Sequence, residues 1–83
     1  MGHRVVIYTK EECCLCDKAK ALLQRLQGEF DLEVKEVDIT GDPAIFEQYR
    51  YNIPVAVVDG LHRFEATKIA EHYLRRVLAP GRR

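Results

Sequence analysis

Three cysteines stand close together near the N-terminus, as Cys13-Cys14-Leu15-Cys16. Two thiols spaced as Cys-x-x-Cys lie one helical turn apart, so they can exchange with a disulfide and then close on each other. The thiolate is the attacking species, and its charge is favoured by the unpaired N–H groups and the dipole of a helix N-terminus. The spacing therefore indicates a reactive dithiol at the beginning of a helix.

The flanking segments predict how this motif is positioned. Residues 5–8 form an apolar run typical of a buried strand, residues 10–12 are polar, and residues 17–27 repeat apolar side chains at helical spacing. Gly28 is expected to end this helix in a left-handed conformation. Cys13 should therefore lie at the entrance of a helix that directly follows a strand.

The middle of the chain predicts a second strand and a second helix. Residues 32–39 alternate apolar and polar side chains. A change of phase near Lys35-Glu36 is interpreted as an irregularity in an edge strand. Asp42 and Pro43 favour a helix start, with a cap followed by proline at the first position. That helix is expected to extend to about residue 49 with one apolar side.

The last third predicts a hairpin and a helix. Residues 55–58 are apolar throughout, which is typical of a strand covered on both faces. Asp59-Gly60 is a strong turn signal that leads back into residues 61–64. An apolar stripe over residues 66–78 predicts a helix that Pro80-Gly81 ends. The resulting order is β-α-β-α-β-β-α, an α/β fold whose first two strands should be parallel.

Size and composition limit the possible classes of protein. The 83 residues allow a single domain over residues 1–83, with a core expected at about 5–78. Lys+Arg and Asp+Glu both number 13, which argues against a nucleic-acid or membrane partner, and there is no long apolar run. Three clustered cysteines cannot form a framework of distant disulfides, so we expect a cytoplasmic protein. The neutral net charge and the short chain lead us to expect a monomer.

Several segments, taken together, are more specific than Cys-x-x-Cys alone. They are Tyr8-Thr9-Lys10, Cys13-Cys14-Leu15-Cys16, Val37-Asp38-Ile39, residues 49–55 with Ile53-Pro54, and Asp59-Gly60. This combination resembles the thioredoxin fold, and within it the small glutaredoxin-like proteins of bacteria. The resemblance extends over about residues 5–78. It implies a four-stranded mixed sheet of order 2-1-3-4, flanked by three helices.

Thiol chemistry assigns the catalytic roles to Cys13 and Cys16. Cys13 would attack a disulfide in a protein or a small molecule, and Cys16 would resolve the mixed disulfide. The resemblance also implies a cis Ile53–Pro54 bond that faces Cys13. The Ile53 backbone groups would then pair with the backbone of a bound peptide or of glutathione.

The chain departs from glutaredoxins where that family holds glutathione. Residues 60–67 lack the Gly-Gly-acid motif that grips the glutathione carboxylate, whereas Lys10 stands where glutaredoxins often place a glutathione-contacting lysine. We therefore expect Lys10, Ile53 and Pro54 to hold glutathione weakly, as a co-substrate. No cofactor is required and no metal is expected. A reductase or glutathione would recycle the dithiol.

Other reactive side chains are assigned less prominent roles. Cys14 is interpreted as semi-exposed and incidental, and the alternative is an auxiliary thiol that is glutathionylated or exchanges with Cys16. Asp38 is interpreted as a solvated turn residue, and the alternative is a buried acid that assists proton transfer to Cys16. The histidines are expected to be solvated: His3, His62 and His72.

Two other functions stay open at this point. The first is a metal or iron–sulfur carrier that uses a glutathione-bridged dimer. Against it, a stable site needs about four ligands, and one chain offers only three crowded cysteines. The second is a redox-inert binding module of the same fold. Against that, a binding module has no need of two thiols one turn apart.

Overall fold

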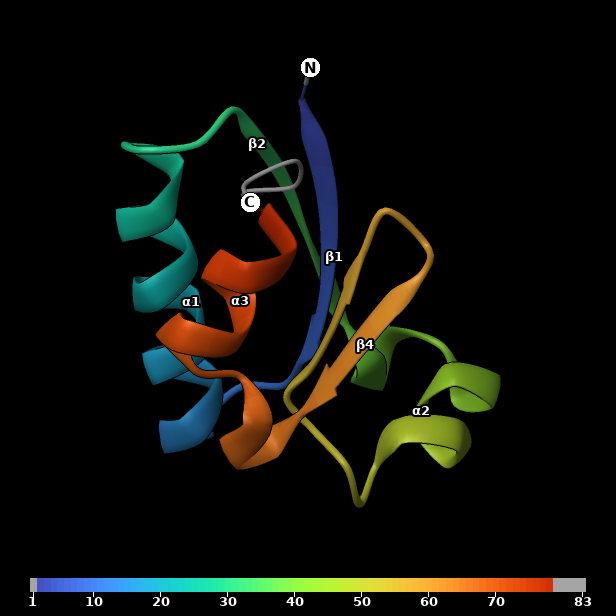
Figure 1. The fold of residues 1–83 in the computed structure, drawn as a ribbon. Helices are drawn as coiled ribbons and strands as arrows, with labels where there is room; N and C mark the ends of the chain where they lie inside the picture. The colour runs from blue at the N-terminus through green and yellow to red at the C-terminus, as the bar shows by residue number, and fades with distance from the viewer. Residues whose placement is uncertain (1, 79–83) are drawn as a thin grey trace.

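The protein is built on one mixed sheet with the strand order β2-β1-β3-β4 (Figure 1). The structure, a computed structural model, describes residues 2–78. β1 (His3–Thr9) pairs in parallel with β2 (Leu32–Asp38) and antiparallel with β3 (Val55–Val58). β3 pairs antiparallel with β4 (His62–Glu65). The predicted strand order 2-1-3-4 and the element order β-α-β-α-β-β-α are confirmed.

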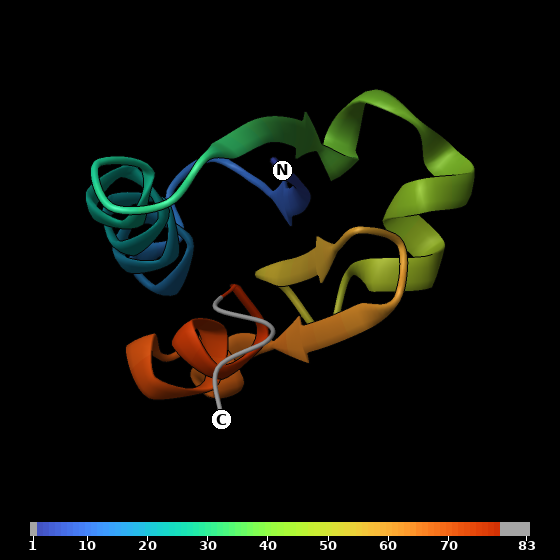
Figure 2. The same ribbon diagram turned by 45° about the horizontal axis from the view of Figure 1, so that its top comes forward.

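Three α-helices cover the two faces of this sheet unequally. α1 (Cys14–Gln27) and α3 (Glu71–Leu78) lie together on one face, and α2 (Pro43–Tyr49) lies on the other, as Figures 1 and 2 show from two directions. Two short 3-10 helices, η1 (Ile39–Gly41) and η2 (Ala66–Lys68), precede α2 and α3. Within residues 2–78, no helix has both the length and the apolar character needed to span a bilayer.

The main core lies between the sheet and the pair α1 and α3. Successive side chains of a strand point to opposite faces, so Val5 and Ile7 enter this core whereas Arg4 and Val6 face away from it. Both Val5 and Ile7 are completely buried. The other buried members of the core are Ala19, Leu23, Leu26, Ala56, Val58, Ile69, Leu74 and Leu78.

The last helix begins later than its apolar spacing predicts. Ala66 has a φ of 49°, a left-handed conformation that an α-helix cannot contain, and residues 66–68 form η2 instead. The α-helix begins at Glu71. Ile69 continues the apolar stripe because it packs on the core from the loop between η2 and α3. The expected stop at Pro80-Gly81 lies outside the described residues.

Two other local predictions were wrong. Gly28 ends α1 with a φ of −76°, in the right-handed region, and its N–H donates to carbonyls of the preceding turn. β2 contains no irregularity, because Lys35 pairs with Val6 and Glu36 with Ile7 in an unbroken register. The phase of the sequence pattern changes because Val37 is half-buried on the face that carries α2, opposite to the core face.

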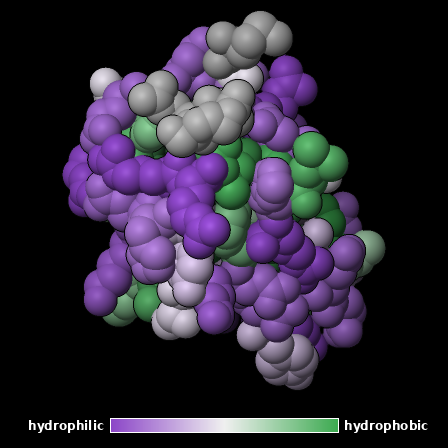
Figure 3. Space-filling view, viewed as in Figure 1, coloured by the Kyte–Doolittle hydropathy of each residue, from purple (hydrophilic) through white to green (hydrophobic). Residues whose placement is uncertain are grey.

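The second face of the sheet is covered only in part. Asp42 caps α2 as predicted, by accepting hydrogen bonds from the N–H groups of Ala44 (2.9 Å) and Ile45 (3.4 Å). The Tyr49 ring stacks on Tyr8 of β1, with ring centroids 4.3 Å apart. The remainder of this face stays open. On the side of the molecule seen in Figure 3, hydrophobic side chains reach the surface beside the β3–β4 hairpin.

Candidate functional site

Cys13 occupies the N-cap position of α1. The chain leaves β1 at Thr9 and turns through Glu12, whose φ of 59° is left-handed. Cys13 is extended, and its Sγ accepts a hydrogen bond from the backbone N–H of Cys16 at 3.3 Å. Because Cys13 supplies the cap, α1 begins at Cys14, three residues before the helical pattern of residues 17–27. The predicted position of Cys13 at the helix entrance is thereby confirmed.

The three cysteines differ sharply in exposure. Cys13 is half-buried, Cys14 is exposed, and Cys16 is completely buried at 0% relative exposure. All three are free thiols. Cys13 is therefore the member of the Cys-x-x-Cys pair that a large partner can reach. Cys16 points into the protein beneath it.

Burial also determines the protonation of the inner thiol. It raises the pKa of Cys16 to about 11, and the hydrogen bond with Cys13 acts in the same direction. The backbone N–H of Lys10 and the charge of Lys20 oppose this shift without cancelling it. At neutral pH Cys16 is accordingly a protonated thiol, and it needs help to become a nucleophile.

The loop before β3 approaches the same end of the sheet. The Ile53–Pro54 bond is cis, as predicted. Val55 pairs with Tyr8, so Pro54 lies across from the end of β1 that leads into the cysteine turn. Pro54 is buried and Ile53 is half-buried, and the carbonyl of Pro54 accepts a hydrogen bond from the Ala66 N–H at 2.7 Å.

Of the segments considered for glutathione binding, the loop of Lys10 lies near Cys13, whereas the stretch that replaces the Gly-Gly-acid motif begins in a turn away from it. Lys10 is exposed in the loop that follows β1, and it forms no ion pair within residues 2–78. The glycine in the stretch that replaces the Gly-Gly-acid motif is Gly60, whose φ of 70° belongs to the hairpin turn. That turn adjoins the beginning of β1 through the hydrogen bond from Asp59 N–H to Arg4, so it lies away from Cys13.

A polar cluster beside Cys16 was missed at the sequence level. Lys20 of α1 and Thr9 of β1 both donate hydrogen bonds to Glu36 Oε2 of β2, at 3.1 Å each. Asp38, the acid weighed from the sequence, instead caps η1 by accepting from the Thr40 N–H at 2.9 Å. Asp38 is exposed, as predicted for a turn residue. The hydroxyl and N–H of Thr40 lower the pKa of Asp38.

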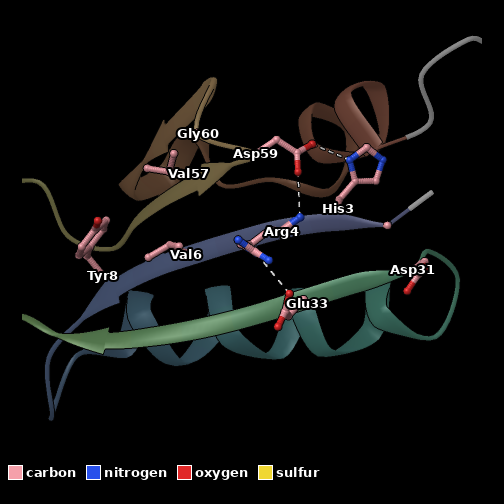
Figure 4. Close-up of a pocket in the computed structure, with 10 residues that line it drawn as sticks. His3, Arg4, Val6, Tyr8, Asp31, Glu33, Val57, Asp59 and Gly60 are labelled. Carbon is pink, nitrogen blue, oxygen red and sulfur yellow. Dashed lines mark hydrogen bonds and ion pairs between the residues drawn. The ribbon is translucent and has the colours of Figure 1, made fainter.

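An open groove of about 910 Å³ lies on the face of the sheet that α2 leaves uncovered (Figure 4). Its floor includes Val6 and Val57, and the Arg4–Glu33 ion pair (3.2 Å) crosses it. Val57 therefore does not have the cover on both faces that the apolar run predicts. No cysteine lines this groove, so it is separate from the dithiol.

His3 is not the solvated side chain that the sequence suggests. Its Nδ1 lies 2.7 Å from Asp59 Oδ2, and its Nε2 lies 3.0 Å from the Leu78 carbonyl oxygen. Figure 4 shows the His3 ring directed toward Asp59. His62 and His72 are exposed, as predicted. Over residues 2–78, no three His, Cys, Asp or Glu side chains are grouped closely enough to hold a metal ion.

Two solved structures share this fold. The X-ray structure of Northeast Structural Genomics target protein XcR50 from X. campestris has a TM-score of 0.68 at 22% identity, covering 94% of this chain and 99% of the other. The crystal structure of the Glutaredoxin from Methanosarcina mazei Go1 has a TM-score of 0.65 at 19% identity, covering 90% and 77%. At these identities the likeness supports the fold.

The sequence itself identifies the family. Residues 4–79 match the model of the Glutaredoxin-like domain (DUF836). This match includes the strand, the cysteine turn, the cis-proline loop and the hairpin described above. The chain therefore belongs to the glutaredoxin-like family of thioredoxin-fold proteins.

Proposed function

We propose that this protein is a thiol–disulfide oxidoreductase in which Cys13 attacks and Cys16 resolves. The observation that carries the proposal is the unequal setting of the two thiols. Cys13 is accessible and accepts an N–H hydrogen bond at the helix N-terminus, which stabilises negative charge on its sulfur. Cys16 lies completely buried one turn further on.

The reaction exchanges two electrons between dithiol and disulfide. The Cys13 thiolate attacks one sulfur of the substrate disulfide, and the other substrate sulfur leaves as a thiolate that takes up a proton. Cys16 then loses its proton and attacks the Cys13 sulfur, which releases the second substrate thiolate. The protein ends as a Cys13–Cys16 disulfide, and the substrate ends as two thiols.

The partners follow from this chemistry. A disulfide-containing protein or small molecule is the substrate, and a dithiol reductase or glutathione returns the protein to its reduced form. No resident cofactor is needed for thiol exchange. Three cysteines clustered in four positions cannot form a framework of distant disulfides, which supports a reducing compartment, and we propose the cytoplasm. Lys10, Ile53 and Pro54 are the residues that we propose to contact glutathione or a substrate backbone.

Trapping the mixed disulfide tests the assignment of roles. With a protein or peptide disulfide, the Cys16→Ser variant should accumulate a covalent adduct on Cys13, detected by non-reducing electrophoresis and mass spectrometry. Cys13→Ser should form no adduct and should not turn over. Cys14→Ser is the matched control, because Cys14 is exposed and lies between the two cysteines in the sequence, and it should retain full activity. Continued turnover by Cys13→Ser would overturn the proposal.

A further inference from the structure

Lys20, one helical turn after the buried Cys16, carries an ammonium group that is paired with Glu36. Lys20 follows Cys16 by one helical turn, which places their Cβ atoms about 5–6 Å apart on one side of α1. The Lys20 ammonium donates to Glu36 Oε2 at 3.1 Å and lies 3.8 Å from Asp17 Oδ1. Thr9 is 1% exposed, and its hydroxyl donates to the same Glu36 oxygen at 3.1 Å. Asp17 of α1 and Glu36 of β2 thus contact this ammonium, and Thr9 of β1 holds the Glu36 oxygen in place.

The protonation of the cluster suits a role in thiolate stabilisation. The hydrogen bond to Glu36 raises the pKa of Lys20, so its ammonium stays charged at neutral pH. Burial raises the pKa of Cys16, and the Lys20 charge acts in the opposite direction on the same thiol. The lysine therefore offsets part of the cost of forming an anion in a buried place.

Other charged groups near Cys16 do not replace this cation. Cys13 contacts Cys16 and raises its pKa further. The Asp17 side chain is negative and 77% exposed. Lys68 belongs to η2, which packs against α1, but its ammonium lies over an aromatic ring of α3. The charge of Lys20 lowers the pKa of Cys16, whereas Lys10 lowers it through its backbone N–H.

Solvent reaches the cluster from the side. A groove of about 500 Å³ runs between α1 and β2 and is lined by Asp17, Lys20 and Glu36. Cys16 does not line this groove, so the groove exposes Lys20 and Glu36 to solvent while the thiol stays buried.

We propose that Lys20, held in place by Glu36, is a positioning residue for the second step, where its ammonium stabilises the Cys16 thiolate. This inference rests on the proposed oxidoreductase function. Cys16 loses its proton, and its electron pair forms the bond to Cys13 Sγ. The bond from Cys13 Sγ to the substrate sulfur breaks, and the substrate leaves as a thiolate that takes up a proton. The two cysteines are oxidised and the substrate is reduced.

A two-phase thiol release assay separates this step from the first. In a Cys14→Ser background, a chromogenic aromatic disulfide releases one coloured thiolate when Cys13 attacks and a second when Cys16 resolves. Lys20→Met should leave the first phase unchanged and slow the second by about three- to tenfold at pH 7, the effect of one nearby charge. The pH needed to reach a given rate of the second phase should rise by about 0.5 to 1 unit.

Controls distinguish a charge effect from a structural one. Lys20→Arg should restore most of the second-phase rate, and added salt should reduce the difference between Lys20→Met and the parent protein. Lys18→Met is matched, because Lys18 is exposed on the same helix and pairs with no carboxylate within residues 2–78, and it should behave as the parent. An unchanged pH profile for Lys20→Met, or no rescue by arginine, would overturn the inference. A parent protein without any Cys16-dependent second phase would instead refute the proposed function.

Discussion

The Sγ atom of Cys13 accepts a hydrogen bond from the backbone N–H of Cys16 at 3.3 Å, so the proposed nucleophile is also the N-cap of α1. One sulfur thus has two tasks. It caps α1 by accepting a hydrogen bond from an N–H group of the first turn, and it is the atom that we propose to attack the substrate. Substitutions at Cys13 should therefore change the stability of the protein as well as its chemistry.

The capping role predicts a difference between two inactive variants. Serine is a good N-cap and alanine is not, so reduced Cys13→Ala should be less stable than Cys13→Ser by about 1 kcal/mol. Urea unfolding in the presence of reductant measures this difference. The same pair of substitutions at Cys14, which is exposed and lies inside the first turn, should differ by less than about 0.5 kcal/mol. Equal stability of the two Cys13 variants would exclude the cap.

Oxidation should link Cys13 to Cys16 and leave Cys14 free. A disulfide between the adjacent residues Cys13 and Cys14 is strained, and the Cys14 side chain is exposed whereas Cys16 is buried. Mild oxidation, alkylation and peptide mapping by mass spectrometry should recover alkylated Cys14 and one disulfide. Cys14→Ser should give the same link. A disulfide that includes Cys14 would instead favour an auxiliary role for this thiol.

Acid should remove a contribution of Asp59 to stability. The Arg4 N–H and His3 lower the pKa of Asp59 below its ordinary value. A lowered pKa in the folded state stabilises the protein above the unfolded value, near pH 4, and this contribution is lost as the pH falls through the folded value. Asp59→Asn is a suitable comparison, because asparagine tolerates the φ of 56° at this position.

The measurement is urea unfolding of both proteins between pH 7 and pH 2.5. The parent protein should be more stable than Asp59→Asn at neutral pH, and the difference should shrink below about pH 4. Glu29 and Glu71, whose pKa values are lowered through Arg75, titrate in both proteins and cancel in the comparison. A difference that stays constant down to pH 2.5 would contradict the role of the Asp59 charge.

Glutathione should recycle the protein poorly. The missing Gly-Gly-acid motif removes a charge-assisted grip worth about 1.5–3 kcal/mol, or roughly ten- to a hundredfold in affinity. Turnover of one disulfide substrate should be slow with glutathione and faster with a thioredoxin-reductase-type system at matched concentrations. An ordinary dithiol glutaredoxin serves as the reference. Equal glutathione-dependent turnover would mean that other residues rebuild the glutathione site.

Much of the fold and the cysteine pair could be predicted because their signals are local. The strand before Cys13, the Asp42 cap and the Asp59-Gly60 turn each depend on a few adjacent residues, and the structure confirms them. The predicted start of α3 was wrong because the apolar spacing continues outside the helix. Ile69 contributes to the core from a loop, and apolar spacing alone does not distinguish that arrangement from a helix.

The polar neighbours of Cys16 could not be predicted in the same way. Thr9, Lys20 and Glu36 belong to three different elements, and their contact depends on the register of β1 against β2 and on how α1 lies over it. The spacing of Lys20 four residues after Cys16 was the one available signal. His3 was missed because its partners, Asp59 and Leu78, are distant in the sequence.

The two hydrogen bonds of His3 have a consequence for attaching the protein to a surface or a probe. One joins the first strand to Asp59 in the β3–β4 turn, and the other joins it to Leu78, the last helical residue described. Both ends of the described chain therefore lie at the end of the sheet opposite to the cysteine turn (Figure 1). A bead, an electrode or a fluorescent probe attached beside these ends would present Cys13 outward. Such a derivative should keep the imidazole of His3, because its hydrogen bond to the Leu78 carbonyl holds the two ends of the described chain together.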